Sequence, residues 1–159
     1  MQTTKNIKIA GLLAVLLCFG LGSAQAALYK ADNANNLNVG ASWVLGGVPG
    51  SSDVAGWDST VAVNTNSALG GNLSWAGIQI LNPGGPITIN GANTLTLGAS
   101  GIDMSSASQS LVLSNRVVLG ADQIWNVTAG QSLTAPYSEI VNCRGLGEAS
   151  KNSSLILEW

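Results

Sequence analysis

The amino-acid sequence predicts an all-β protein, built as a right-handed parallel β-helix with three short strands in each coil. Three observations support this fold class. Short triplets with an apolar residue at each end recur along the chain, turn-forming residues separate them, and the triplets repeat with a period of about 23 residues. A chain of 159 residues has room for one such domain.

The triplets alternate apolar and other residues, which is typical of a short strand with one buried face. They are Val61–Val63, Ile78–Ile80, Ile87–Ile89, Leu95–Leu97, Ile102–Met104, Leu111–Leu113, Val117–Leu119 and Trp125–Val127. Their central or neighbouring positions, such as Thr88, Thr96, Asp103 and Asn126, are expected to point outward. Gly, Asn and Pro, which tight turns favour, fill the segments between them.

Three interleaved series of apolar residues share the long period. They are Ile78, Ile102 and Ile124; Ile87, Leu111 and Leu133; and Leu95, Val117 and Val141, with consecutive members about 22 to 24 residues apart. Backward extrapolation adds Val54, Val61 or Val63, and Leu73, and forward extrapolation adds Leu146 and Leu155. Counterparts would stack about 4.8 Å apart in roughly four coils. An antiparallel β-sandwich is the alternative fold, because strands spaced about 7 to 9 residues apart also suit a sandwich.

Residues 1–26 have the layout of a secretory signal peptide, with a helical apolar core. Its parts are the basic residues Lys5 and Lys8, the apolar run Ile9–Leu21, and the small residues Ala24 and Ala26, before a cleavage that would leave Ala27 first. A membrane anchor is the alternative, but the apolar run is shorter than the roughly 20 residues of a membrane span. We therefore expect an exported protein that contacts a membrane only through the uncleaved signal peptide.

Residues 27–58 are rich in Asn and Gly and are predicted to form an irregular cap segment, followed by β-helix repeats over residues 59–159. A coil cannot bury its apolar side alone, so the ends of a solenoid need caps. Trp43 and Trp57 are interpreted as packing residues of this cap, and stacking against carbohydrate is the alternative role.

The composition excludes several classes of function. Charged residues are 9% of the chain and the net charge is −2, with no basic patch, so nucleic acid is not an expected partner. The chain has no His, which excludes Ser-His-Asp catalysis and His-ligated zinc. After loss of the signal, Cys143 is the single cysteine, so no internal disulfide forms and Cys143 is interpreted as a packing residue. We expect no cofactor.

The charged residues of the predicted coils are the candidates for catalysis or metal binding. They are Asp53, Asp58, Asp103, Asp122 and Arg116. Glycoside hydrolysis needs two carboxylates about 5 to 10 Å apart, and calcium needs several converging oxygen ligands. Asp103 and Asp122 do not lie a whole coil apart, so they need not stack. We interpret all five as solvated wall and turn residues, and predict no catalytic or metal-ligating residue.

Two stretches, Ile87–Ser105 and Val118–Leu133, resemble the passenger regions of bacterial autotransporter-associated β-strand-repeat proteins. The Asn-rich start, Trp43 and Gly47–Gly50 are similar as well, and the resemblance covers residues 31–135. It implies an exported β-helix that is secreted or displayed on a bacterial cell surface, with surface glycans or proteins as partners. Beyond residue 145 the chain departs from the glycine-rich family pattern, so we expect the repeats to be incomplete at the C-terminus.

The sequence therefore predicts an exported structural or adhesive surface protein without enzymatic activity. A carbohydrate-active β-helix enzyme, either a polysaccharide lyase or a hydrolase, is the alternative. A groove in which several charged side chains meet would favour the enzyme.

Overall fold

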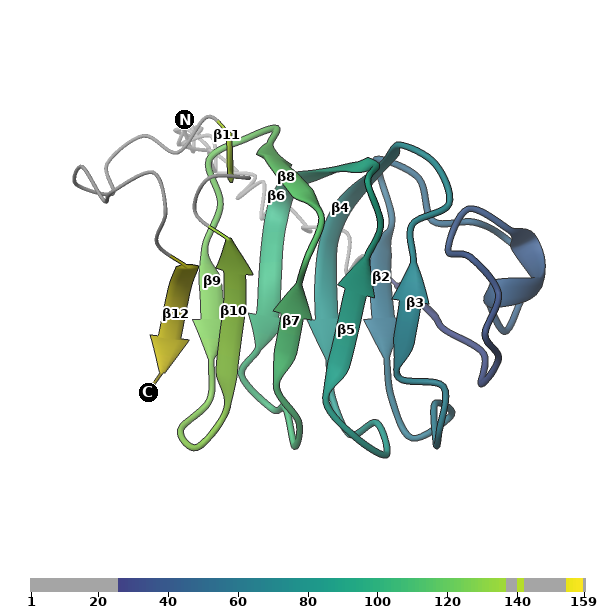
Figure 1. Ribbon diagram of the computed structural model, residues 1–159, viewed down its shortest axis with the longest axis horizontal. Coiled ribbons are helices and arrows are strands. Elements are labelled where there is room, and N and C mark those ends of the chain that lie inside the picture. Colours follow the sequence, from purple (N-terminus) through teal and green to yellow (C-terminus); the bar gives the residue numbers. More distant parts are fainter. Residues whose placement is uncertain (1–25, 137–139, 142–153, 159) are drawn as a thin grey trace, which may run out of the picture.

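The computed structural model describes residues 26–136, 140–141 and 154–158, which form an all-β solenoid of about 5 turns of about 23 residues (Figure 1). Its strands are β1 Ala27–Tyr29, β2 Val54–Trp57, β3 Asn66–Ala68, β4 Leu73–Ile80, β5 Ile87–Asn90, β6 Thr94–Met104, β7 Leu111–Leu113, β8 Arg116–Leu119, β9 Trp125–Val127, β10 Ser132–Pro136, β11 Ile140–Val141 and β12 Ser154–Glu158. Strands of successive coils pair in parallel. The predicted parallel β-helix is thus confirmed, and the antiparallel sandwich is wrong.

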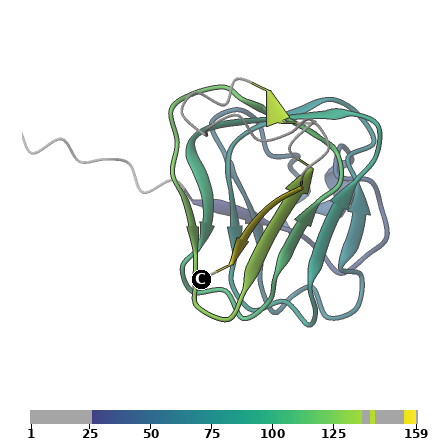
Figure 2. The same cartoon turned by 60° about the vertical axis from the view of Figure 1, so that its left-hand side comes forward.

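The strands form three faces around one interior. Face 1 contains β3, β5, β7, β10 and β12, which lie in front in Figure 1. Face 2 contains the first halves of β4 and β6 together with β8 and β11. Face 3 contains β1, β2, the second halves of β4 and β6, and β9. Because β4 and β6 bend at the corner between faces 2 and 3, these two faces belong to one hydrogen-bonded sheet, and Figure 2 shows the coils stacked behind one another.

Inward columns of apolar side chains fill the interior, as the long period predicts. Ile87 pairs with Leu111, and Leu111 with Leu133, on face 1. On face 2, Leu73 pairs with Leu95 and Leu95 with Val117, and on face 3 Ile78 pairs with Ile102. Almost all of these side chains are fully buried, and Leu73 is half-buried against the same core. Burial of these stacked side chains is the main force that holds the coils together.

One predicted counterpart is wrong by a single residue at the corner between faces 2 and 3. Trp125, not Ile124, pairs with Ile102, and the Ile124 side chain is 71% exposed. Between the flanking paired residues the corner lengthens along the chain, from Ala76–Gly77 in β4, to Gly98–Gly101 in β6, to Gly120–Ile124 in the next coil. Since side chains alternate along a strand, one extra corner residue moves Ile124 from the inside to the outside.

Two other predicted counterparts are each wrong by one residue, and a third position was predicted as either Val61 or Val63. Val117 pairs with Ile140 rather than with Val141. In the first coil, Ala55 rather than Val54 pairs with Ile78. Of Val61 and Val63, the first is buried and the second is 77% exposed.

The direction of the C-terminal strand β12 differs from the prediction. β12 pairs antiparallel with β10, placing Leu157 opposite Leu133 and Leu155 opposite Ala135. Leu155 therefore does not continue the parallel column of Leu133. Figure 2 shows β12 lying beside β10 at the end of face 1. Leu146 and Cys143 lie outside the described residues.

The N-terminal segment over residues 27–58 is more regular than predicted. β1 pairs in parallel with β2, so face 3 begins at Ala27. Between these strands the chain makes one 3₁₀ turn, η1 Gly40–Ser42, and Lys30 forms a single bridge with Trp43. The predicted signal helix and Ala24 lie outside the described residues. Within the part of the chain that is described, no helix is long and apolar enough to cross a membrane.

Candidate functional site

A row of polar side chains runs along the outer wall of face 3, perpendicular to the strands. Tyr29, Gln79, Asp103 and Asn126 occupy the same outward register in β1, β4, β6 and β9. Gly56 occupies that register in β2, between Tyr29 and Gln79. Parallel pairing places equivalent residues of neighbouring strands about 4.8 Å apart. These residues are called the polar ladder below.

The N-terminal part of the polar ladder, from Tyr29 to Gln79, depends on Gly56. The Tyr29 hydroxyl donates a hydrogen bond of 3.1 Å to Oε1 of Gln79, which lies two strands away. The Tyr29 ring must therefore cross Gly56. A Cβ atom at that position would lie 2.8 Å from the ring carbons, closer than side chains pack. Glycine at residue 56 is what lets Tyr29 reach its partner.

Asp103 is the charged member of the polar ladder. Its Oδ1 accepts hydrogen bonds from the Ser105 hydroxyl at 2.6 Å and from the Ser105 backbone N–H at 3.0 Å. The Ser105 hydroxyl is the main cause that holds the pKa of Asp103 below its usual value; partial burial opposes it, and the Ser105 N–H and the Gln79 side chain add to it. Asp103 is thus a fixed carboxylate at neutral pH.

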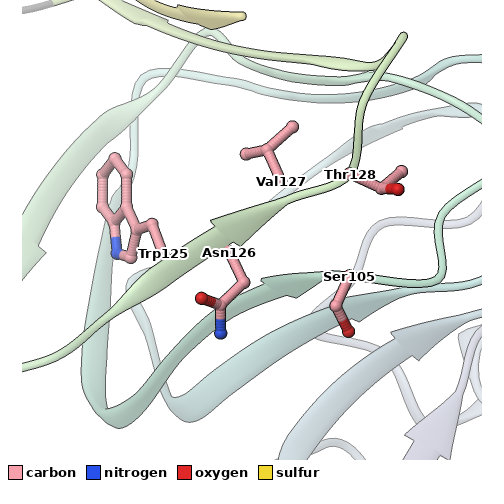
Figure 3. A pocket seen from close by; sticks show the side chains of 5 residues that line it. All are labelled: Ser105, Trp125, Asn126, Val127 and Thr128. Atoms are coloured by element: carbon pink, nitrogen blue, oxygen red, sulfur yellow. The ribbon is translucent and has the colours of Figure 1, made fainter. Parts of the chain in front are cut away.

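Two hollows open where the polar ladder ends, and Asn126 borders both. The first has a volume of about 350 Å³ and is lined by Ser105, Trp125, Asn126, Val127 and Thr128 (Figure 3). The second has a volume of about 510 Å³ and is lined by Ala99, Ser100, Asp122, Gln123, Ile124 and Asn126. The second hollow lies at the corner that lengthens along the chain, so the extra residues there create it.

The indole of Trp125 is held in place at the first hollow. Its Nε1 donates a 2.9 Å hydrogen bond to Oε1 of Gln123, and Nε2 of Gln123 donates to the carbonyl of Leu97 at 3.2 Å. Figure 3 shows Trp125 and Val127 on one side of β9, with Asn126 and Ser105 on the other. The outer wall therefore offers the amide of Asn126 and the hydroxyl of Ser105, while the Trp125 ring packs against the core.

The candidate charged residues are spread over the wall and its turns. Asp53 accepts a hydrogen bond from the Gly50 N–H at 2.9 Å, and Asp58 from the Thr60 N–H at 2.9 Å, so both stabilise turns as predicted. Asp122 lines the second hollow, while Arg116 is exposed on face 2 opposite Thr94. Among the described residues, no group of three or more His, Cys, Asp or Glu side chains could hold a metal ion.

The tryptophans divide into buried packing residues and one that borders a hollow. Trp43 and Trp57 are buried and stand edge to face, with ring centroids 5.9 Å apart, which confirms the packing interpretation and excludes sugar stacking by these two rings. Trp125, the first residue of a predicted strand triplet, is the half-buried tryptophan at a hollow. Tyr29 was not singled out either, because β1 falls in a segment without a strand pattern.

Comparison with known proteins returns no relative. No family model matches the chain, and neither a curated protein nor a solved structure is significantly similar to it.

Proposed function

We propose that this chain is an exported bacterial surface protein with a structural or adhesive role, and that the wall of face 3 contacts neutral glycans. The observation that carries the proposal is the polar ladder, which spans the coils from β1 to β9 and ends in two hollows. A parallel solenoid presents such a row in a straight line, which suits an extended polymer better than a compact molecule. No catalytic activity is proposed.

The chemistry of the wall supports a neutral glycan as the partner. Sugars present hydroxyl groups that bind amides and hydroxyls. Asn126, Ser105 and Thr128 supply such groups at the first hollow. The fixed carboxylate of Asp103 on the same wall would repel anionic sugars, so uncharged sugars fit better.

Export is supported by the signal-like segment and by the position of the first strand. β1 begins at Ala27, the residue that predicted cleavage would make the first of the mature chain. Cleavage there would leave every described strand in the mature protein. The resemblance of residues 31–135 to autotransporter-associated repeat proteins agrees with a place outside the cytoplasm, at or beyond the periplasm of a bacterium.

Export is tested by expressing the full chain in a Gram-negative bacterium and fractionating the cells. We expect the protein in the periplasm, medium or outer surface, with Ala27 at its N-terminus by sequencing. The variant Ala26→Leu removes the small residue before the cleavage point and should remain uncleaved at the inner membrane. A full-length chain that stays in the cytoplasm would contradict the proposed location.

Glycan contact is tested separately on the purified mature chain with an array of neutral and acidic oligosaccharides. We expect binding to neutral members, with a loss of at least about tenfold in Asn126→Ala, since a lost hydrogen bond of about 1.4 kcal/mol is tenfold. Thr88→Ala, on the outward side of face 1, is the matched control. Product release from the bound glycans would instead support the carbohydrate-active enzyme.

A further inference from the structure

Three buried polar atoms of the first complete coil have no hydrogen-bond partner among the described residues. They are Nε1 of Trp57, Oγ of Ser67 and Nε1 of Trp75. Both indoles are fully buried and Ser67 is 4% exposed, so bulk water does not reach them. Buried donors and acceptors without partners are rare in native proteins, so each calls for an explanation.

The three residues lie in one layer of the interior. β2, β3 and β4 follow one another around this coil, and each contributes one of the three residues, from faces 3, 1 and 2 respectively. The two indole centroids are 6.1 Å apart. In the next coil the counterparts of these residues are Ile80, Ile89 and Leu97, which carry no polar side-chain atom. These three atoms therefore share one layer, while Oδ1 of Asn115, which also lacks a partner among the described residues, lies in a later coil.

The chemistry of the three atoms matches one small ligand. Each indole N–H can only donate, whereas the serine hydroxyl can both donate and accept. A water molecule accepts two hydrogen bonds and donates two, and buried waters typically have about three protein partners. We propose that this layer holds one ordered water, which accepts from Trp57 and Trp75 and donates to Ser67.

Packing against the ring of Trp43 is the alternative explanation for the unpartnered indole N–H groups. Trp43 stands nearly perpendicular to Trp57 and Trp75, at 71° and 84°, so an indole N–H could point at a ring face. Trp43 itself is satisfied, because its Nε1 donates to the carbonyl of Leu37 at 2.9 Å. Contacts between rings would leave Ser67 Oγ without an acceptor or donor, so one water for all three groups accounts for more of the observations.

The test is solution NMR on the full mature chain labelled with ¹⁵N. We expect the Nε1–H signals of Trp57 and Trp75 to show cross-peaks with water in both NOE and rotating-frame spectra, with signs that indicate a long-lived water. The Nε1–H of Trp43 should show none, because a carbonyl occupies it. Indole N–H signals shifted strongly upfield and lacking water cross-peaks would overturn the proposal in favour of ring contacts.

A pair of variants then tests the third ligand. Ser67→Ala should abolish both water cross-peaks, whereas Ser110→Ala, a matched change in the part-buried pair of Ser110 and Ser132, should keep them. Cross-peaks that persist unchanged in Ser67→Ala would show that Ser67 does not hold the water. If Ser67→Ala does not fold, Trp75→Phe replaces it as the test, because phenylalanine keeps an aromatic ring but has no N–H. Loss of the Trp57 cross-peak with water in Trp75→Phe would support the shared water, and an unchanged cross-peak would contradict it.

Discussion

The first coil and the coils that follow it fill equivalent inward positions with different side chains. The inward residues of the first coil include Ala55, Trp57, Ser67 and Trp75, while their counterparts in the next coil are Ile78, Ile80, Ile89 and Leu97. The later coils have an apolar layer on both sides. The first coil instead meets Trp43 from the cap segment, which contacts both tryptophan rings. Large aromatic side chains therefore close this end of the solenoid.

The cap segment is also polar where the later coils are apolar. Lys30 is fully buried, and its ammonium donates to the carbonyls of Ala31 and Asn33 and to Oδ1 of Asn33 at 2.7 to 3.1 Å. Asp32 accepts hydrogen bonds from the side chain and backbone of Asn64, which ties the cap to the first coil. Four predictions test the difference between the cap segment and the later coils.

The largest effect is expected for Trp75→Ala. Truncating a buried tryptophan costs about 3 to 5 kcal/mol, and Trp75 contacts the rings of both Trp43 and Trp57. Its counterpart in the next coil is Leu97, for which Leu97→Ala should cost about 2 to 4 kcal/mol. Urea unfolding followed by circular dichroism measures both free energies of unfolding. A smaller loss in Trp75→Ala than in Leu97→Ala would contradict the role of the aromatic layer.

The second prediction concerns the corner between faces 2 and 3. Gly101 has a φ of +62°, and a Cβ atom there would collide with the carbonyl oxygen of Ile124 in the next coil. Gly130 has a φ of +83° but nothing near its Cβ position, so it is the matched control. Gly130→Ala should cost about 1 kcal/mol through backbone strain alone. Gly101→Ala should cost about 3 kcal/mol, because the two strands must also separate. Equal losses of stability would show that the corner is not tightly stacked.

The third prediction concerns the buried lysine of the cap. Lys30→Met keeps the apolar stem but leaves the carbonyls of Ala31 and Asn33 without their donor, at a cost of about 1 to 2 kcal/mol. Burial lowers the pKa of Lys30 from 10.5, and the charge of Asp32 opposes the shift. The unfolded chain then binds the proton more tightly, so stability should rise with pH between the lowered pKa and 10.5. Denaturation across alkaline pH should show this rise in the wild type and not in Lys30→Met.

The smallest effect on the free energy of unfolding is expected for substitutions at Asp103 and Ser105 on the wall of face 3. The pKa of Asp103 is lowered mainly by the hydrogen bond from the Ser105 hydroxyl. The ionised Asp103 therefore stabilises the folded state above its unfolded pKa of 3.8, and this stabilisation is lost as the pH falls through the folded pKa. The contribution should stay below about 1 kcal/mol, because solvent screens a partly exposed group. Asp103→Asn and Ser105→Ala should both flatten the acid limb of a stability-against-pH curve. An unchanged acid limb in both variants would show that the ladder does not stabilise the fold.

Much of the fold was predictable, and the candidate site only in part. The repeat period predicts the column of Ile87, Leu111 and Leu133, because apolar alternation in each strand is a local property. Asp103 and Asn126 were also expected to point outward. Tyr29 was not recognised, because β1 lacks alternation and becomes a strand only through its pairing with β2. The hollows at Asn126 depend on the corner at Gly120–Ile124, whose extra residue has no local signal.

The strand pattern, the coil period and most of the inward columns follow from the amino-acid sequence alone, since side-chain direction along a strand repeats every second residue whatever lies beside it. Three features emerge only in the folded molecule: where each strand stops, the pairing of Trp125 instead of Ile124 with Ile102, and the antiparallel pairing of β12 with β10. These features depend on hydrogen bonds between coils and on corner lengths, which join residues far apart in the chain. The packing of Trp43 on the first coil also depends on contacts between distant residues, because Trp43 lies outside the repeats and the repeat pattern does not predict its neighbours.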